Sequence, residues 1–158
     1  HLNGEMLKAL AGIDLIHVPY KGSNPAIADV IAGQAQLMIG NLPPILPHIR
    51  SGKVRALAVT TPVRFAATPE LPPVAETVPG YESLAWFGLF APAATPREIV
   101  SRWHADTVAS MALPEIRERI VQLGFDAVGN TPEAYAALLR ADIAKWQRVV
   151  RLSGARPE

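Results

Sequence analysis

The 158-residue chain carries 15 lysine and arginine residues against 14 aspartate and glutamate residues, and 49% of its residues are hydrophobic. This composition predicts a chain with a buried core, and the balanced charge excludes the polybasic surface that nucleic-acid binding requires. Cysteine is absent, which excludes disulfides, thiolate metal sites and a cysteine nucleophile. No apolar run approaches about 18 residues, so direct membrane insertion is not expected.

The first residues read as the middle of a helix. Leu2, Met6 and Leu10 recur at intervals of four, and Gly12 is a typical helix stop. The chain does not begin with Met, has no cap residue before this helix, and shows no charged segment followed by an apolar one as in a signal peptide. We therefore expect sequence upstream of His1 to be missing.

Short apolar runs and helical patterns then alternate as far as residue 60. A helix capped by Ser23 or Asn24 is predicted to run to Gly33, and a shorter helix to end at Gly52. Strands are predicted over 14–20, 34–40 and 54–60. This alternation predicts parallel pairing with right-handed crossovers, and so a small α/β lobe.

The second half begins with a proline-rich connection over 62–80, with one helical turn at 74–77. Residues 83–93 form an apolar run that predicts a strand buried on both faces, and 125–129 predict a brief strand. Helices are predicted over 96–111, behind a capping box from Thr95 to Glu98, over 114–123, and from 132 onward behind Thr131. These segments contain too few strands to close a sheet alone.

Catalytic and metal-binding motifs are not found in the sequence. It has no nucleophile elbow, phosphate loop, dinucleotide fingerprint or zinc-protease motif, so we assign no catalytic residue and no cofactor. The four histidines lack ligand-like spacing, so no metal site is assigned: His1, His17, His48 and His104. A small hydrolase using Ser23 and His17, with Asp14 as a third member, stays as an alternative.

The positive signal comes from two points where a predicted strand leads into a helix. Lys21, Gly22 and Ser23 follow the first strand, and Gly40 and Asn41 follow the second. Ligands of parallel sheets bind at such ends, where unpaired backbone N–H groups and small side chains suit a carboxylate. The alternative is that Ser23 and Asn41 only cap helices and that Lys21 is solvated.

Four segments together carry a family resemblance. "VPYKG", the Gly-to-Asn spacing that ends at Asn41, "PHIRSGKVRALAVT" and "WFGLFAPA" resemble the Bug-type receptors of tripartite tricarboxylate transporters. The resemblance implies an α/β fold like that of type II periplasmic binding proteins, with two lobes that close on a small organic carboxylate. It also implies a non-enzymatic periplasmic receptor that delivers its solute to membrane permease subunits.

The resemblance covers only the C-terminal half of such a receptor. It implies that 1–78 are most of the second, ligand-closing lobe, 79–95 a crossing segment, and 96–158 the helical part of the first lobe, with the chain truncated at its N-terminus. Trp86 and Phe87 are expected to pack within the crossing strand, and the alternative is that they approach the wall of the ligand cleft. A ligand-sensing module that serves no transporter stays as a further alternative.

Carried over by motif, the ligand-binding positions implied by the resemblance are His1, Lys21, Gly22, Ser23, Gly40 and Asn41. Many relatives have an acidic residue directly before the Asn, where this chain has Gly40. The carboxylate that could pair with an amino group of a ligand is therefore missing here.

Overall fold

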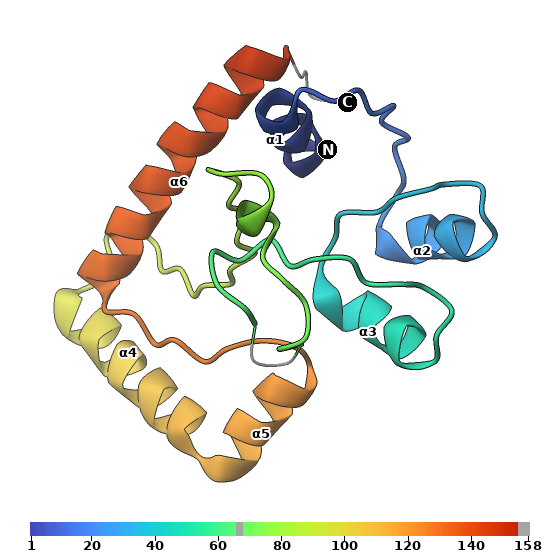
Figure 1. The fold of residues 1–158 in the computed structure, drawn as a ribbon. Helices are drawn as coiled ribbons and strands as arrows, with labels where there is room; N and C mark the ends of the chain where they lie inside the picture. Colours follow the sequence, from blue (N-terminus) through green and yellow to red (C-terminus); the bar gives the residue numbers. More distant parts are fainter. Residues whose placement is uncertain (66–67, 155–158) are drawn as a thin grey trace. The chain divides into compact units, whose positions relative to one another are not determined.

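The computed structural model describes residues 1–65 and 68–154, and within them the regular elements are helices (Figure 1). In chain order they are α1 (Leu2–Ala11), α2 (Ser23–Ile31), α3 (Leu42–Arg50), the 3-10 helix η1 (Val74–Glu76), α4 (Arg97–Ala112), α5 (Pro114–Gln122) and α6 (Pro132–Ser153). Every helix predicted from the sequence is present, with bounds that differ by a few residues.

Local signals account for several helix ends. Gly12 follows α1 with a φ of 65°, a left-handed conformation that glycine adopts without steric cost, and its N–H reaches the carbonyl of Lys8. At the start of α6, the Ala134 N–H donates to Thr131 Oγ1 at 3.2 Å. The side-chain cap predicted at Thr131 is therefore confirmed.

Two other predicted caps do not form. Gly22, rather than Ser23 or Asn24, occupies the N-cap position of α2, and no side chain there makes a capping hydrogen bond. Pro96 occupies the N-cap position of α4, again without a side-chain cap, so the predicted capping box from Thr95 to Glu98 is wrong. Pro96 has a non-helical ψ of 140° and stays outside the helix, so Thr95 lies one residue before the cap position.

The predicted strands are wrong as strands in the described part of the chain. Residues 14–20, 34–40, 54–60, 83–93 and 125–129 form no named strand, and the β pairing consists of two isolated bridges, Val59 with Pro73 and Phe65 with Thr68. A strand exists only if a neighbour pairs with it, and prolines in the connection lack the N–H groups that a ladder needs. The apolar runs therefore lie as extended chain.

The chain divides into two compact units, one formed by His1–Ala85 with Trp146–Glu158 and the other by Trp86–Lys145. The C-terminal boundary of the second unit falls inside α6, between Lys145 and Trp146. The division into 1–78, 79–95 and 96–158 that the family resemblance implies stays a prediction.

The first unit has a small core around Tyr81, which is only 1% exposed. Met6 of α1 and Val149 of α6 are buried with it, and five partly buried side chains pack against the three: Leu2, Leu7, Val74, Val78 and Trp146. The Tyr81 hydroxyl donates to the Asn3 carbonyl at 3.3 Å, and burial raises the pKa of Tyr81. The Ser83 hydroxyl donates to Asn3 Oδ1 at 2.8 Å.

In the second unit, two aromatic rings pack against that of Tyr135. The ring of Trp86 stands at 90° to that of Tyr135 with centroids 5.3 Å apart, and the ring of Phe90 lies 5.7 Å away. A Cβ atom placed on Gly88 would overlap the hydroxyl and ring of Tyr135, so only glycine fits against this side chain. Trp86 itself packs against Tyr135 of α6.

A polar cluster joins the first and last residues of the second unit. Trp86 Nε1 donates to Asp142 Oδ2 at 2.6 Å, and Lys145 Nζ lies 2.7 Å from Asp142 Oδ1. The carboxylate of Asp142, one helical turn before Lys145, therefore holds both ends of the unit. Charge-assisted hydrogen bonds of this kind are about twice as strong as neutral ones.

Truncating the core of the first unit should destabilise it. Met6→Ala removes most of a buried side chain from beside Tyr81, and we expect the free energy of unfolding to fall by about 2–5 kcal/mol in urea denaturation. Ile16→Ala is the control, because Ile16 is 91% exposed and its truncation should change stability by no more than about 0.5 kcal/mol. Equal losses in the two variants would contradict the described core.

The second unit should not tolerate a side chain at residue 88. Gly88→Ala forces Tyr135 or the backbone to move, and we expect a loss of about 1–3 kcal/mol together with a weakened near-ultraviolet circular dichroism signal. Because the hydroxyl oxygen, Cζ and Cε1 of Tyr135 would all overlap the added Cβ, Gly88→Ala should cost less in a Tyr135→Ala background, which removes all three atoms. An unchanged cost in that background would show that the Tyr135 side chain is not the obstacle.

Candidate functional site

The loop before α2 is built around Gly22. Its φ of 114° and ψ of 176° lie in a region that side chains with a Cβ rarely adopt, and nothing lies within 4 Å of where a Cβ would be. Ser23 follows as the first residue of α2. The helix therefore begins with open space above Gly22 and with first-turn N–H groups that no side chain caps.

Tyr20 and Asp29 hold this loop against its own helix. The Tyr20 hydroxyl donates to Asp29 Oδ2 at 2.7 Å, across nine residues. This hydrogen bond to the carboxylate raises the pKa of Tyr20 above its ordinary value of 10.0. The sequence analysis missed the pair, since no local pattern relates positions nine residues apart on a loop and a helix.

The second predicted loop leads into α3. Asn41 is the N-cap residue, with extended φ and ψ of −69° and 140°, and its side chain makes no capping hydrogen bond. Gly40 precedes it, and a Cβ there would meet the flexible end of Met38 at 2.6 Å. The first turn of α3 contains Pro43 and Pro44, which reduces its free N–H donors.

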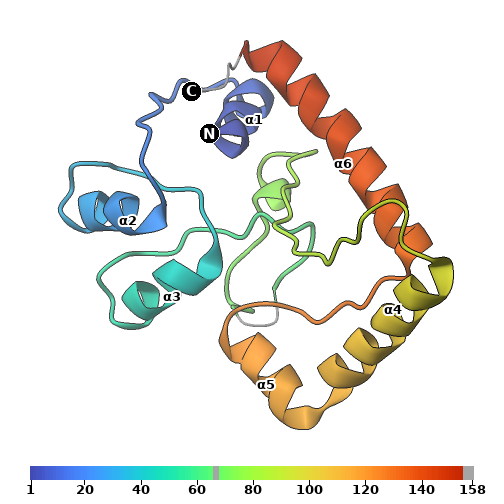
Figure 2. The same ribbon diagram turned by 180° about the vertical axis from the view of Figure 1, so that it is seen from behind.

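Helices α2 and α3 contact each other within the first unit. In Figures 1 and 2 they lie side by side, and both begin at the same end of the pair. The N-cap residues of the two helices, Gly22 and Asn41, therefore stand at the same end of the pair. Two helix N-termini at one end give a locally positive potential, worth roughly 0.3–1 kcal/mol for each helix toward an exposed anion.

Lys21 lies beside Gly22 and is exposed, and it forms no ion pair with any residue that the structure describes. No hydrogen bond joins Ser23 to His17 in the described residues, and the ring of His17 stacks on that of His1. The arrangement of nucleophile and base that the hydrolase alternative needs is not formed.

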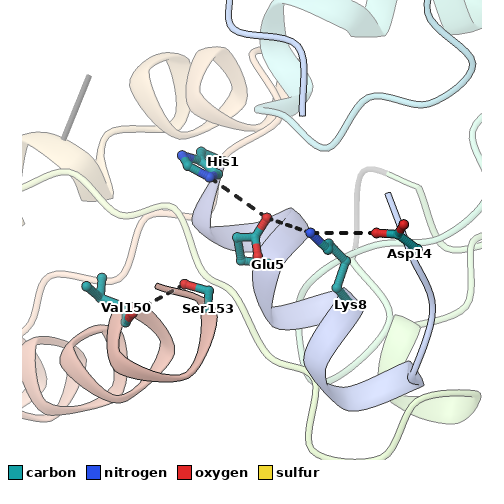
Figure 3. Close-up of polar contacts among 6 residues, drawn as sticks. All are labelled: His1, Glu5, Lys8, Asp14, Val150 and Ser153. Atoms are coloured by element: carbon teal, nitrogen blue, oxygen red, sulfur yellow. Dashed lines mark hydrogen bonds and ion pairs between the residues drawn. The ribbon is translucent and has the colours of Figure 1, made fainter. Parts of the chain in front are cut away.

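His1 begins α1 and contacts two groups (Figure 3). Its ring stacks on that of His17, with centroids 4.0 Å apart and planes 7° from parallel. Its Nε2 lies 3.8 Å from Glu5 Oε1, and Glu5 also pairs with Lys8 at 3.2 Å. No hydrogen bond, ion pair or ring contact joins His1 to residues 21–23 or 40–41 in the described chain. The figure also shows Ser153 donating to the Val150 carbonyl of α6.

The second unit has a hollow of about 390 Å³ at the start of α4 and α6. Arg97, Ser101 and Glu133 contribute its polar lining. Because a carboxylate accompanies the guanidinium there, the hollow has no evident preference for an anion.

Within the described residues, no group of three or more His, Asp or Glu side chains could hold a metal ion. None of the described helices combines the length and the apolar character that crossing a membrane demands.

Residues 1–154 match the model of the "Tripartite tricarboxylate transporter family receptor", TctC. The chain belongs to this family. TctC proteins are transport receptors and not enzymes, which agrees with the receptor expected from the sequence. The hydrolase alternative therefore has no support from the family or from the geometry of Ser23.

Two TctC-family relatives show how much of the family this chain spans. A protein from the tcbD–tcbE intergenic region of Pseudomonas sp. strain P51 is 40% identical over 152 residues, which are 95% of this chain and 45% of the relative. A protein from the clcB–clcD intergenic region of Pseudomonas knackmussii is 38% identical over 152 residues, which are 95% of this chain but 90% of the relative. The matched residues thus make up most of the P. knackmussii protein but less than half of the P51 protein.

Solved structures agree with the fold at the level of the backbone. The periplasmic binding protein BugD is 34% identical with a TM-score of 0.82, covering 100% of this chain and 54% of BugD. MatC from Rhodopseudomonas palustris, solved with bound malate, is 31% identical with a TM-score of 0.77, covering 94% of this chain and 52% of MatC. The chain therefore has the fold of about half of a periplasmic binding protein.

Gly22→Ala should strain the loop before α2. We expect a loss of about 1–3 kcal/mol, seen as faster hydrogen exchange in the first turns of α2, because the φ of 114° disfavours a Cβ although the space is open. Gly4→Ala is the matched control. Gly4 lies inside α1 with equally open space, so this substitution should stabilise by about 0.5–1 kcal/mol. The same response in both variants would contradict the described conformation of Gly22.

Proposed function

We propose that the chain is the solute-closing half of a periplasmic receptor that captures a small organic carboxylate for a tripartite tricarboxylate transporter. The observation that carries the proposal is the match to MatC, a structure with bound malate, over 94% of this chain at 31% identity. The membership of the TctC family supplies the transport role.

The N-terminal ends of α2 and α3 are the proposed contacts for the carboxylate. Main-chain N–H groups in the first turn of α2 are left without a side-chain cap, and the open space at Gly22 lets an anion approach the backbone. Ser23 and Asn41 offer short polar side chains at the same end of the helix pair. This geometry suits a planar anion with several acceptor oxygens.

Lys21 and His1 have different proposed roles. The exposed ammonium of Lys21 lies next to Gly22 and would attract an anion over a distance set by salt screening. The stack on His17 fixes the ring of His1. His1 would therefore contact a ligand with the parts of its ring that the stack leaves uncovered. Gly40 has no side chain and so leaves room for a ligand, and the side chain of Met38 beside it would form an apolar surface of the proposed site.

The proposed partners are a small carboxylate and the permease subunits of the transporter, and the proposed location is the periplasm. BugD and MatC each match over about half of their own length. The rest of the binding surface would therefore come from the part of the receptor that this chain does not span. Closure of the two parts around the solute would desolvate it and present the closed surface to the permease.

A chimera tests the proposal. The segment of MatC that matches this chain is replaced by the 158 residues, and malate binding is measured by isothermal titration calorimetry beside a panel of mono-, di- and tricarboxylates. We expect the chimera to bind at least one carboxylate, and Gly22→Ala to weaken that binding at least about tenfold, which corresponds to about 1.4 kcal/mol.

Gly4→Ala in the same chimera is the control and should leave the affinity unchanged. The 158-residue chain by itself should show little thermal stabilisation by the same panel, because ligand stabilisation follows the affinity of the folded state. A folded chimera that binds no carboxylate would overturn the proposed function. Tight binding by the 158-residue chain alone would overturn the proposal that the site is built from two parts.

A further inference from the structure

The loop that leads into α2 has little packing of its own. Lys21, Gly22 and Asn24 are exposed, and nothing lies within 4 Å of a Cβ atom placed on Gly22. In the described structure, residues 20–24 make one hydrogen bond outside the ladder of α2, from the Tyr20 hydroxyl to Asp29 Oδ2. A segment with so few buried contacts is mobile unless a tether restrains it.

The tether connects the loop to the firmly packed part of α2. Ile27 is 3% exposed and anchors the helix in the first unit, and Asp29 lies two residues further along the same helix. The distance of 2.7 Å between the Tyr20 hydroxyl and Asp29 Oδ2 is typical of a strong hydrogen bond to a carboxylate. Tyr20 is therefore held to the anchored turn of α2, and residues 21–28 form a closed ring between the two side chains.

The main chain of Asp29 restrains the segment that follows α2. Its carbonyl oxygen accepts hydrogen bonds from the Gln34 N–H at 2.8 Å and from the Ala35 N–H at 3.2 Å. One residue thus fastens the segment before α2 through its side chain and the segment after α2 through its carbonyl. Because the second segment continues to Gly40 and Asn41, both segments that lead to the candidate site are tied to the same residue.

The tethered loop contains three main-chain N–H groups without a partner. The amides of Gly22, Ser23 and Asn24 donate no hydrogen bond within the described residues, and Pro25, which follows them, has no N–H. Such groups bind an anion best when the loop already holds them in place, because ordering a flexible loop on binding costs conformational entropy. The hydrogen bond of Tyr20 reduces that cost before binding.

We propose that Tyr20 and Asp29 are positioning residues of the carboxylate site, and that their hydrogen bond holds residues 21–24 in the solute-binding conformation before the solute arrives. Neither side chain needs to contact the solute. The inference rests on the proposed function for the identity of the ligand. Its structural part, the restraint of the loop, holds with or without a solute and is measured separately.

The first test uses the 158-residue chain without ligand. Tyr20→Phe removes the hydroxyl and keeps the ring, and we expect the backbone 15N order parameters of residues 21–24 to fall from the rigid range, about 0.85, toward the flexible range, below about 0.6. Asp29→Leu should have the same effect. Asp29→Asn is the conservative control, because its amide oxygen still accepts from the hydroxyl, and it should leave the loop ordered. Unchanged order parameters in Tyr20→Phe would overturn the inference.

The second test measures affinity in the MatC chimera, with the acid of the panel that it binds most tightly, beginning with malate. Tyr20→Phe and Asp29→Leu should each weaken binding at least about tenfold, and the double variant should bind no more weakly than either, because both changes break one interaction. Asp29→Asn should restore the affinity to within about threefold of the unmodified chimera, although it lacks the charge.

The outcomes separate this inference from the proposed function. Additive losses in the double variant, or an Asp29→Asn chimera as weak as Asp29→Leu, would overturn the positioning role while the chimera still binds its acid. A folded chimera that binds no acid overturns the proposed function instead, and the order parameters of residues 21–24 then decide by themselves whether Tyr20 restrains the loop.

Discussion

The burial of Tyr81 connects stretches of the first unit that are far apart in sequence. Its ring packs with Met6 of α1 and Val149 of α6, and its hydroxyl reaches the main chain at Asn3. Ser83, two residues later, fixes the Asn3 side chain. Because α1 is positioned by these contacts, so is His1 at its start, and with it the stack on His17. The geometry around α1 thus depends on one buried aromatic ring.

The helices could be predicted from the sequence because their signals are local. Apolar spacing, Gly12 after α1 and the Thr131 cap before α6 each act within a few residues, and the structure shows them in those roles. The capping box at Thr95 failed for an equally local reason, since Pro96 takes the cap position. The strands could not be judged in this way, because a strand depends on a partner that sequence spacing does not reveal.

The same distinction between local signals and tertiary contacts applies to the candidate site. Gly22 was expected where an apolar run leads into a helix, and it is the N-cap residue of α2, with a φ of 114°. The Tyr20–Asp29 hydrogen bond and the His1–His17 stack are tertiary contacts between residues with no shared pattern, and they could be found only in three dimensions. Which of the six proposed positions contact a solute stays a prediction.

The contact of Trp86 and Lys145 with the same Asp142 carboxylate has an architectural consequence. These two residues are the first and last of the second unit, so the chain enters and leaves that unit at neighbouring points. The second unit has the topology of an inserted module, whose long loop is closed by a tryptophan, a lysine and one carboxylate. Closing a loop of that length costs entropy that grows only slowly with length. Loss of the Asp142 carboxylate would therefore release the entry and exit points of the second unit together.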